Sequence, residues 1–230
     1  MAKNPAQLSL FAPPPTLTRA EAIEKLRQML GDDLRPLSDQ YGLTAPGVTP
    51  LNKGWAGLTV ERLLGLVQNN EQGPDFGDWE LKVIPLKQMK RAEVLTWGLK
   101  GPLALTMCQL KQLQGQTFEE SLLWAKIQRL LIVTRLYYSP EEERSELFGL
   151  APYDISGEVR GELSREYEEM RWCLRTQGVM GLKEYQGRLL ALQDQGERAG
   201  WSFYAKRPFI TAALSGLITS TSPDPLKSTL

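Results

Sequence analysis

Residues 79–86, with the sequence WELKVIPL, place two charged side chains inside an otherwise apolar segment. The aliphatic and β-branched residues of this segment predict a buried strand. Glu80 and Lys82 are two positions apart, so their side chains leave the same face of that strand. Two charges on a buried face cost free energy unless they are paired or bind a metal ion. The segment therefore predicts either a solvated turn before an ordinary strand, or a charged site at the start of a buried one.

Further carboxylates precede this strand. Asp75 lies in the turn before it, and Glu61 lies at the edge of the apolar face of a predicted helix. Asp78 shares the parity of Glu80 but lies in the turn, which makes it a weaker candidate. Mg²⁺ held by two or three carboxylates activates water for phosphodiester hydrolysis, and a nearby ammonium group such as that of Lys82 can orient or deprotonate that water. Because a D-x4-E-x-K pattern also arises by chance, the solvated turn stays open as the alternative.

The chain contains no histidine, and its cysteines, Cys108 and Cys173, are far apart. The lack of histidine excludes Ser–His and Cys–His catalysis and most transition-metal sites. The sparse cysteines exclude a disulfide framework and are typical of a reducing cytoplasm, where we expect this protein to act near the nucleoid. The formal net charge is zero, so a DNA-binding protein of this composition must gather its basic groups on one face. Catalysis is then expected to use carboxylates, lysine and a hard cation.

The hydrophobic pattern predicts one mixed α/β domain over residues 17–218. Helices are expected at 18–30, 54–68, 117–128, 158–178 and 208–218. Strands are expected at 79–86, 93–99, 129–138, 187–193 and 201–205, with a polar connection through residues 87–91. Residues 1–16 and 219–230 contain prolines and polar residues, so we expect flexible tails there.

Two segments, NKGWAGLTVERLLG and PDFGDWELKVIP, together resemble the MutH family of mismatch-repair nicking endonucleases and the related restriction enzymes that cut GATC. Both groups are PD-(D/E)xK nucleases. The family pattern is met in order by Lys53-Gly54-Trp55, Glu61, Asp75-Phe76, Glu80-Leu81-Lys82 and Ile84-Pro85. Farther on, TFEESLLWAKIQRLLIV and SFYAKRPF resemble two later family segments. The resemblance implies a restriction-endonuclease-like α/β fold, with a mixed central β-sheet flanked by helices.

The resemblance also implies roles for the acidic cluster. Asp75 and Glu80 would bind Mg²⁺, which Mn²⁺ can replace, and Lys82 would position or activate the attacking water. Glu61 would be an accessory carboxylate near the metal. The spacing between Asp75 and Glu80 is shorter than expected for MutH itself and closer to that of the restriction enzymes.

Basic residues would bind the DNA backbone. The resemblance implies that Lys53 and Lys126 hold phosphates or stabilise the charge of the transition state. It also places the DNA-contacting tyrosine of the family at Tyr204. Lys206 and Arg207 follow this tyrosine, and an aromatic ring with two cations suits stacking combined with phosphate contact.

Base recognition is expected in the segment GRLLALQDQGER, residues 187–198. One alignment puts Gln193 and Gln195 where the family has arginine and lysine. Glutamine pairs well with adenine whereas arginine favours guanine, so this alignment questions GATC recognition. A small shift would bring Arg188 or Arg198 into the same role, and the alternative is that these are surface polar residues.

The pentapeptide QLSLF, formed by Gln7, Leu8, Ser9, Leu10 and Phe11, resembles the bacterial sliding-clamp-binding motif. Its two last side chains would fill an apolar pocket, and a flexible flank leaves the peptide free to bind. The alternative is that its apolar residues pack against the domain. A clamp partner favours a role in repair over restriction.

Three functions follow from these patterns. The first is a monomeric, Mg²⁺-dependent, sequence-specific endonuclease of the MutH type, which nicks double-stranded DNA in a repair pathway and responds to a sliding clamp or a MutL-like activator. The second is a type II restriction endonuclease that cuts both strands. The third is a catalytically silent DNA-binding module, against which the intact acidic cluster argues.

Overall fold

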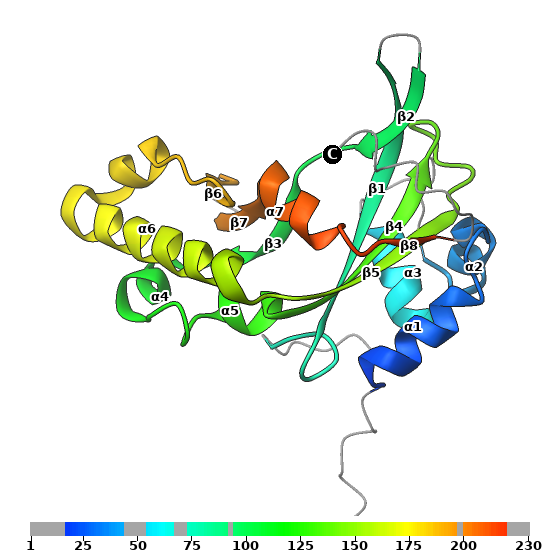
Figure 1. Ribbon diagram of the computed structural model, residues 1–230, viewed down its shortest axis with the longest axis horizontal. Helices are drawn as coiled ribbons and strands as arrows, with labels where there is room; N and C mark the ends of the chain where they lie inside the picture. The colour runs from blue at the N-terminus through cyan, green and yellow to red at the C-terminus, as the bar shows by residue number, and fades with distance from the viewer. Residues whose placement is uncertain (1–16, 44–53, 67–72, 92–93, 197–199, 220–230) are drawn as a thin grey trace, which may run out of the picture.

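The computed structural model describes residues 17–43, 54–66, 73–91, 94–196 and 200–219, and Figure 1 shows their arrangement. The clamp-like residues 7–11, Lys53 and Arg198 lie outside these ranges. Within them, no helix combines the length and the apolar character that crossing a membrane requires.

The described strands form two sheets. The larger sheet has the order β2-β1-β4-β5-β8 and consists of β1 (Glu80–Arg91), β2 (Val94–Leu99), β4 (Arg129–Tyr137), β5 (Leu147–Asp154) and β8 (Ile218–Thr219). Strands β1 and β4 are parallel and the other neighbours are antiparallel, so this sheet is mixed. The smaller, antiparallel sheet has the order β3-β7-β6 and consists of β3 (Leu103–Cys108), β6 (Leu190–Asp194) and β7 (Trp201–Ala205).

Helices cover the larger sheet on both sides (Figure 1). One group contains α1 (Arg19–Arg27), α2 (Leu34–Gln40) and α3 (Trp55–Leu63). The other lies toward the smaller sheet and contains α4 (Leu110–Gly115), α5 (Leu122–Ile127), α6 (Gly157–Glu184) and α7 (Arg207–Ala213). The expected mixed central sheet flanked by helices is therefore confirmed.

Strand β4 lies at the centre of the core. Leu131 and Val133 pack with the apolar faces of α1, α2 and α3. Leu130 and Ile132 point the other way, into the core formed with α5, α6, α7 and the smaller sheet. Both faces of β4 are thus buried, which explains why its sequence is a continuous apolar run instead of an alternating one.

The parallel pairing of β1 with β4 positions the acidic cluster. In the register of the pair, Glu80 lies opposite Leu130, so both strands begin at the same edge of the sheet. Helix α5 ends at Ile127, immediately before β4. The last turn of α5 therefore lies next to the start of β1, although the two segments are distant in sequence.

Several predicted boundaries are wrong for identifiable reasons. Residues 87–91 continue β1 instead of forming a connection, because they pair with β2 in a ribbon on which Lys87, Gln88 and Lys90 are exposed. Residues 117–120 are not helical, because Ser121 caps α5 by accepting a hydrogen bond from the Trp124 amide. Helix α6 continues to Glu184, beyond a kink at Gly178, where φ is 67° and the helix was expected to end.

Other elements were shorter than predicted or were missed. Helix α7 ends at Ala213, and the chain then enters β8 instead of remaining helical to residue 218. Strand β6 begins only at Leu190, because residues 187–189 form a separate turn. Helices α2 and α4 and strands β3 and β5 were not predicted. In β5, Gly149 and Pro152 weaken the sequence signal for a strand.

Candidate active site

The start of β1 carries a buried carboxylate with an ammonium group beside it. The Glu80 side chain is 1% exposed, and its Oε1 atom lies 2.5 Å from Nζ of Lys82. The two side chains share one face of the strand, as their spacing predicted. Because Glu80 is buried, a fully solvated turn does not describe this part of the chain.

The turn before β1 brings Asp75 to the same place. Its geometry depends on Gly77, which has a φ of 80°, and on the stacked rings of Phe76 and Trp79, whose centroids are 4.1 Å apart. The backbone amide of Asp75 donates a hydrogen bond of 3.1 Å to Oε2 of Glu80. The turn itself therefore brings these two acidic residues, which are close in sequence, into contact.

Lys126 joins the cluster from α5. Its Nζ lies 3.0 Å from Oε1 of Glu80 and 3.6 Å from Oδ1 of Asp75. The two carboxylates consequently share one ammonium group, while Lys82 provides a second positive charge on Glu80. This arrangement compensates the desolvation of the buried carboxylate.

Glu61 faces the cluster from α3. Burial raises the pKa of its carboxyl group, the charge of Asp75 raises that pKa further, and Lys82 partly opposes both effects. The coupling means that these groups lie within electrostatic reach of one another. Asp78, the weaker candidate, is exposed and forms an ion pair with Arg129 instead.

The carboxylate oxygens of this site are suited to a hard divalent cation, although the described side chains alone do not enclose one. Among the described residues, no three Asp, Glu, Cys or His side chains are grouped closely enough to enclose a metal ion on their own. Asp75 and Glu80 nevertheless converge on a single cationic group, the ammonium of Lys126. Mg²⁺ is often held by one or two carboxylates, with waters and substrate phosphate completing its shell, so two converging carboxylates suffice for such a site.

A cleft of about 690 Å³ lies between the β1–β2 ribbon and the smaller sheet. Its apolar lining residues include Leu86, Trp97 and Ile210, and its polar lining residues come mainly from the later part of the chain. Of the predicted DNA-contacting residues, those that line the cleft are Gln193, Tyr204, Lys206 and Arg207. Gln195 is exposed but does not line this cleft.

The cleft continues toward the acidic cluster. A neighbouring cavity of about 320 Å³ is lined by Lys82 and Lys100 and shares Gly101 and Pro102 with the cleft. Lys82 therefore belongs both to the acidic cluster and to a cavity adjoining the cleft. Lys100 in this cavity and Lys183 in the cleft were not singled out from the sequence, because isolated lysines in polar segments carry no distinctive pattern.

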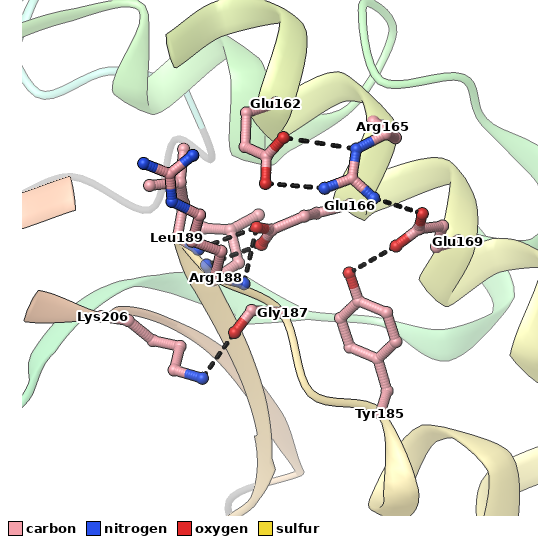
Figure 2. Close-up of polar contacts among 10 residues, drawn as sticks. Glu162, Arg165, Glu166, Glu169, Tyr185, Gly187, Arg188, Leu189 and Lys206 are labelled. Atoms are coloured by element: carbon pink, nitrogen blue, oxygen red, sulfur yellow. Dashed lines mark hydrogen bonds and ion pairs between the residues drawn. The ribbon is translucent and has the colours of Figure 1, made fainter. Parts of the chain in front are cut away.

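The predicted DNA-contacting cations differ in their surroundings. Lys206 is half-buried, and its Nζ donates to the backbone carbonyl of Gly187 (Figure 2). Arg207 is exposed on the first turn of α7. Arg188 is also exposed, but its backbone amide is bound to the carboxylate of Glu166.

Known proteins match the part of the chain that contains the acidic cluster. Residues 64–150 match the family model described as DNA mismatch repair enzyme MutH. The DNA mismatch repair protein MutH of Shewanella sp. (strain W3-18-1) is 32% identical over 128 residues, which are 55% of this chain and 53% of that protein. Over this part of its length the chain is similar to MutH proteins. The MutH protein of Shewanella baltica (strain OS185) matches over the same length, and that of Shewanella sp. (strain MR-4) is 30% identical over 123 residues.

The MutH match covers only part of the candidate site. The chain spans about half the length of the curated MutH relatives that it matches. The family model covers Asp75, Glu80, Lys82 and Lys126. It includes neither Glu61 nor the cleft residues after position 150. The comparison with MutH therefore supports the acidic pair with its two lysines, and not these other residues.

Proposed function

We propose that this protein is a Mg²⁺-dependent, sequence-specific DNA endonuclease of the MutH type, which nicks DNA in a repair pathway. The observation that carries the proposal is the buried carboxylate of Glu80, contacted by Lys82 and Lys126 and adjacent to Asp75. The MutH match over residues 64–150 contains all of these positions. An acidic pair with two lysines at a cavity is suited to hydrolysis of a phosphodiester bond.

Each residue of the cluster has a role in this proposal. Asp75 and Glu80 would hold the metal ion, with Glu61 as an accessory carboxylate. A bound Mg²⁺ would make the attacking water more acidic and neutralise charge that develops on the scissile phosphate. Lys82 would orient that water from its position beside Glu80. Lys126 would leave its bridging position and hold a phosphate oxygen instead.

The cleft would hold the duplex beside this centre. Tyr204, Lys206 and Arg207 line one wall, where cationic and aromatic side chains can contact phosphates and sugars. Gln193 lies on the same wall and would contact a base edge. Gln195, outside the cleft lining, would contact DNA only beyond this wall. Lys53, outside the described residues, would hold a phosphate or stabilise the charge of the transition state.

A type II restriction endonuclease is the second candidate. The short spacing between Asp75 and Glu80 favours it, since that spacing is closer to the restriction enzymes. A monomer with one acidic cluster makes a single nick in each binding event, and a double-strand cut requires a second event on the opposite strand. The products of one assay distinguish these two functions.

The test is cleavage of supercoiled plasmid in Mg²⁺, with plasmids that contain or lack GATC. We expect wild type to produce nicked circles from the GATC plasmid alone, and Lys82→Ala to produce none. The matched control is Lys87→Ala, because Lys87 lies on the same strand but is exposed. Linear product would instead identify a restriction endonuclease, and cutting of both plasmids would mean that Gln193 sets a different specificity.

DNA binding without cleavage, under conditions that include a sliding clamp and a MutL-like activator, would identify a catalytically silent module. The clamp is part of this proposal because of the QLSLF segment at residues 7–11. We expect the double variant Leu10→Ala/Phe11→Ala to lose binding to the clamp while keeping basal nicking. Unchanged clamp binding by this variant would contradict the role of the segment.

A further inference from the structure

Glu166 is a buried acidic residue that the proposed chemistry does not use. It lies on α6 and its side chain is fully enclosed, with 0% exposure. Its neighbours on the helix, Glu162 and Glu169, both form ion pairs with Arg165 at the surface (Figure 2). A carboxylate in the core is expensive unless strong partners stabilise its charge, so the contacts of Glu166 require an explanation.

The partners of Glu166 are backbone amides of the turn before β6. Its Oε1 atom accepts hydrogen bonds of 2.7 Å from the Arg188 amide and 2.8 Å from the Leu189 amide. Its Oε2 atom accepts one of 2.8 Å from the Leu190 amide. Successive backbone amides that converge on one anion form a concave anion site, which here is filled by a side chain of the same protein.

Gly187 makes this contact possible. A Cβ atom at Gly187 would lie 2.5 Å from Oε2 of Glu166 and 2.6 Å from the carbonyl oxygen of Leu190. Neither neighbour can yield easily, because one is a fully buried carboxylate and the other belongs to the backbone of β6. The position therefore requires glycine on grounds of space.

The same turn is tied to the wall of the cleft. The carbonyl of Gly187 accepts a hydrogen bond from Nζ of Lys206, and the carbonyl of Leu189 accepts one of 2.8 Å from the Lys206 amide. Residues 190–193 and 204–207 line the cleft, and Ala191 pairs with Tyr204 across the sheet. Glu166 thus holds the point at which both strands of this wall are joined to α6.

We propose that Glu166 is a positioning residue that fixes the DNA-reading wall of the cleft without touching DNA itself. The inference rests on the proposed function, since it assigns Glu166 a part in sequence recognition. Its carboxylate sets where β6 begins, and therefore which side chains of β6 face the cleft. Glutamine at this position would keep the size of the side chain but replace one acceptor oxygen with an amide group that has no acceptor among these N–H groups.

The experiment combines Glu166→Gln, Gly187→Ala and their double variant, with Glu162→Gln as the matched control on the same helix. Hydrogen exchange of the amides at 188–190 is measured without DNA. Affinity and nicking are then measured on a duplex with the sequence mapped at the wild-type nick, and on a scrambled duplex.

For Glu166→Gln we expect the amides at 188–190 to exchange at least about tenfold faster. The ratio of affinities for the mapped and scrambled duplexes should fall by about tenfold, the size of one lost base contact. The nicking rate at saturating DNA and the affinity for the scrambled duplex should stay within about twofold, because the acidic cluster and the phosphate contacts are intact. Gly187→Ala should reproduce these changes, and the double variant should add little, since both remove one interaction.

Unchanged exchange at 188–190 in Glu166→Gln would overturn the anchoring role. Faster exchange with an unchanged affinity ratio would overturn the role in recognition, and so would equal losses on both duplexes. If the wild-type protein neither nicks nor binds DNA, the proposed function fails and the recognition role fails with it. The exchange data would still decide separately whether Glu166 anchors the turn.

Discussion

Lys126 is the residue that sets the charge balance at the acidic cluster. Its ammonium group contacts both Glu80 and Asp75, where a bound Mg²⁺ would also have to approach them. Removing this group leaves two carboxylates close together, with Glu61 nearby. A buried charge that loses a partner costs about 3–5 kcal/mol, and we expect the lower end because Lys82 still contacts Glu80.

Lys126→Ala should therefore be destabilised in metal-free buffer and should recover more stability than wild type when Mg²⁺ is added. The reason is that an ion bound to the folded state stabilises it more when the ion binds more tightly, and the ammonium group no longer competes. Urea unfolding with and without Mg²⁺ measures both effects. Lys111→Ala, at an exposed position of α4, is the control. Equal stabilisation of wild type and Lys126→Ala by Mg²⁺ would contradict this competition.

A second buried ion pair supports α3. Arg135 and Glu142 contact each other at 3.0 Å with both side chains almost fully enclosed, and the indole of Trp55 donates to Glu142 at 2.5 Å. We expect Arg135→Met to lower the free energy of unfolding by about 3 kcal/mol, because Glu142 would lose its guanidinium partner and keep only the longer contact with Lys100, at 3.7 Å.

The double variant Arg135→Met/Glu142→Gln should recover part of this loss, since the substituted amide side chain is uncharged and still offers an oxygen to Trp55. Urea denaturation of the single and double variants tests the effect. A double variant less stable than Arg135→Met would mean that the contact of Glu142 with Lys100, whose Nζ lies 3.7 Å from Oε1 of Glu142, stabilises the charge enough without Arg135.

At the residue scale, the sequence predicted contacts that depend on local geometry. The period of a strand is enough to place Glu80 and Lys82 on one face, and they are in contact. The approach of Lys126 to Glu80 depends on how β1 and β4 pair, which no local pattern specifies. That lysine was singled out only through the resemblance to MutH. Glu166 was not predicted, because its partners are backbone amides, which leave no mark on the sequence.

At the scale of elements, two glycines illustrate how context decides the effect of the same substitution. Gly161 lies on the exposed side of α6, and a Cβ there would meet nothing within 4 Å. Gly149 lies in β5, where a Cβ would be 2.9 Å from the carbonyl oxygen of Ile218 in β8. The first site offers space in a helix, whereas the second is a close approach between two strands.

We expect Gly161→Ala to stabilise the protein by about 0.5–1 kcal/mol, because alanine reduces the conformational freedom of the unfolded chain and favours helix. Gly149→Ala should destabilise it by about 1–3 kcal/mol through overpacking against β8. Thermal unfolding of the two variants compares them directly. The two substitutions must change the stability in opposite directions. A stabilised Gly149→Ala would show that β8 does not need this close approach.

Elements with one dominant signal were predicted well, and those with mixed signals were not. The apolar run of β4 and the aromatic segment of β7 were identified close to their observed bounds. The sequence at the end of β1 indicates a polar connection instead of a strand, because its exposed polar residues have no core to alternate against. The kink at Gly178 shows a further limit, because glycine at that point ends one helical segment and the chain then begins another.

At the scale of the whole molecule, zero net charge makes the distribution of charge decisive. A neutral protein binds DNA only where cations are concentrated, and the described cleft collects Lys183, Lys206 and Arg207. The acidic cluster lies near one end of this path, through the cavity that contains Lys82 and Lys100. A compact basic path beside the acidic cluster would direct the phosphate backbone toward the carboxylates, which would otherwise repel it.

The salt dependence of DNA binding tests this path. Each phosphate contact contributes about 0.9 to the slope of log K against log salt concentration, so Lys183→Ala and Arg207→Ala should each lower the slope by about one. Arg165→Ala should leave the slope unchanged, because Arg165 is exposed on α6, pairs with Glu162 and Glu169, and does not line the cleft. The measurement is the dissociation constant of a scrambled duplex at several salt concentrations. An equal reduction of the slope for all three variants would mean that DNA binding depends only on the overall charge of the protein. The cleft would then not be the binding surface.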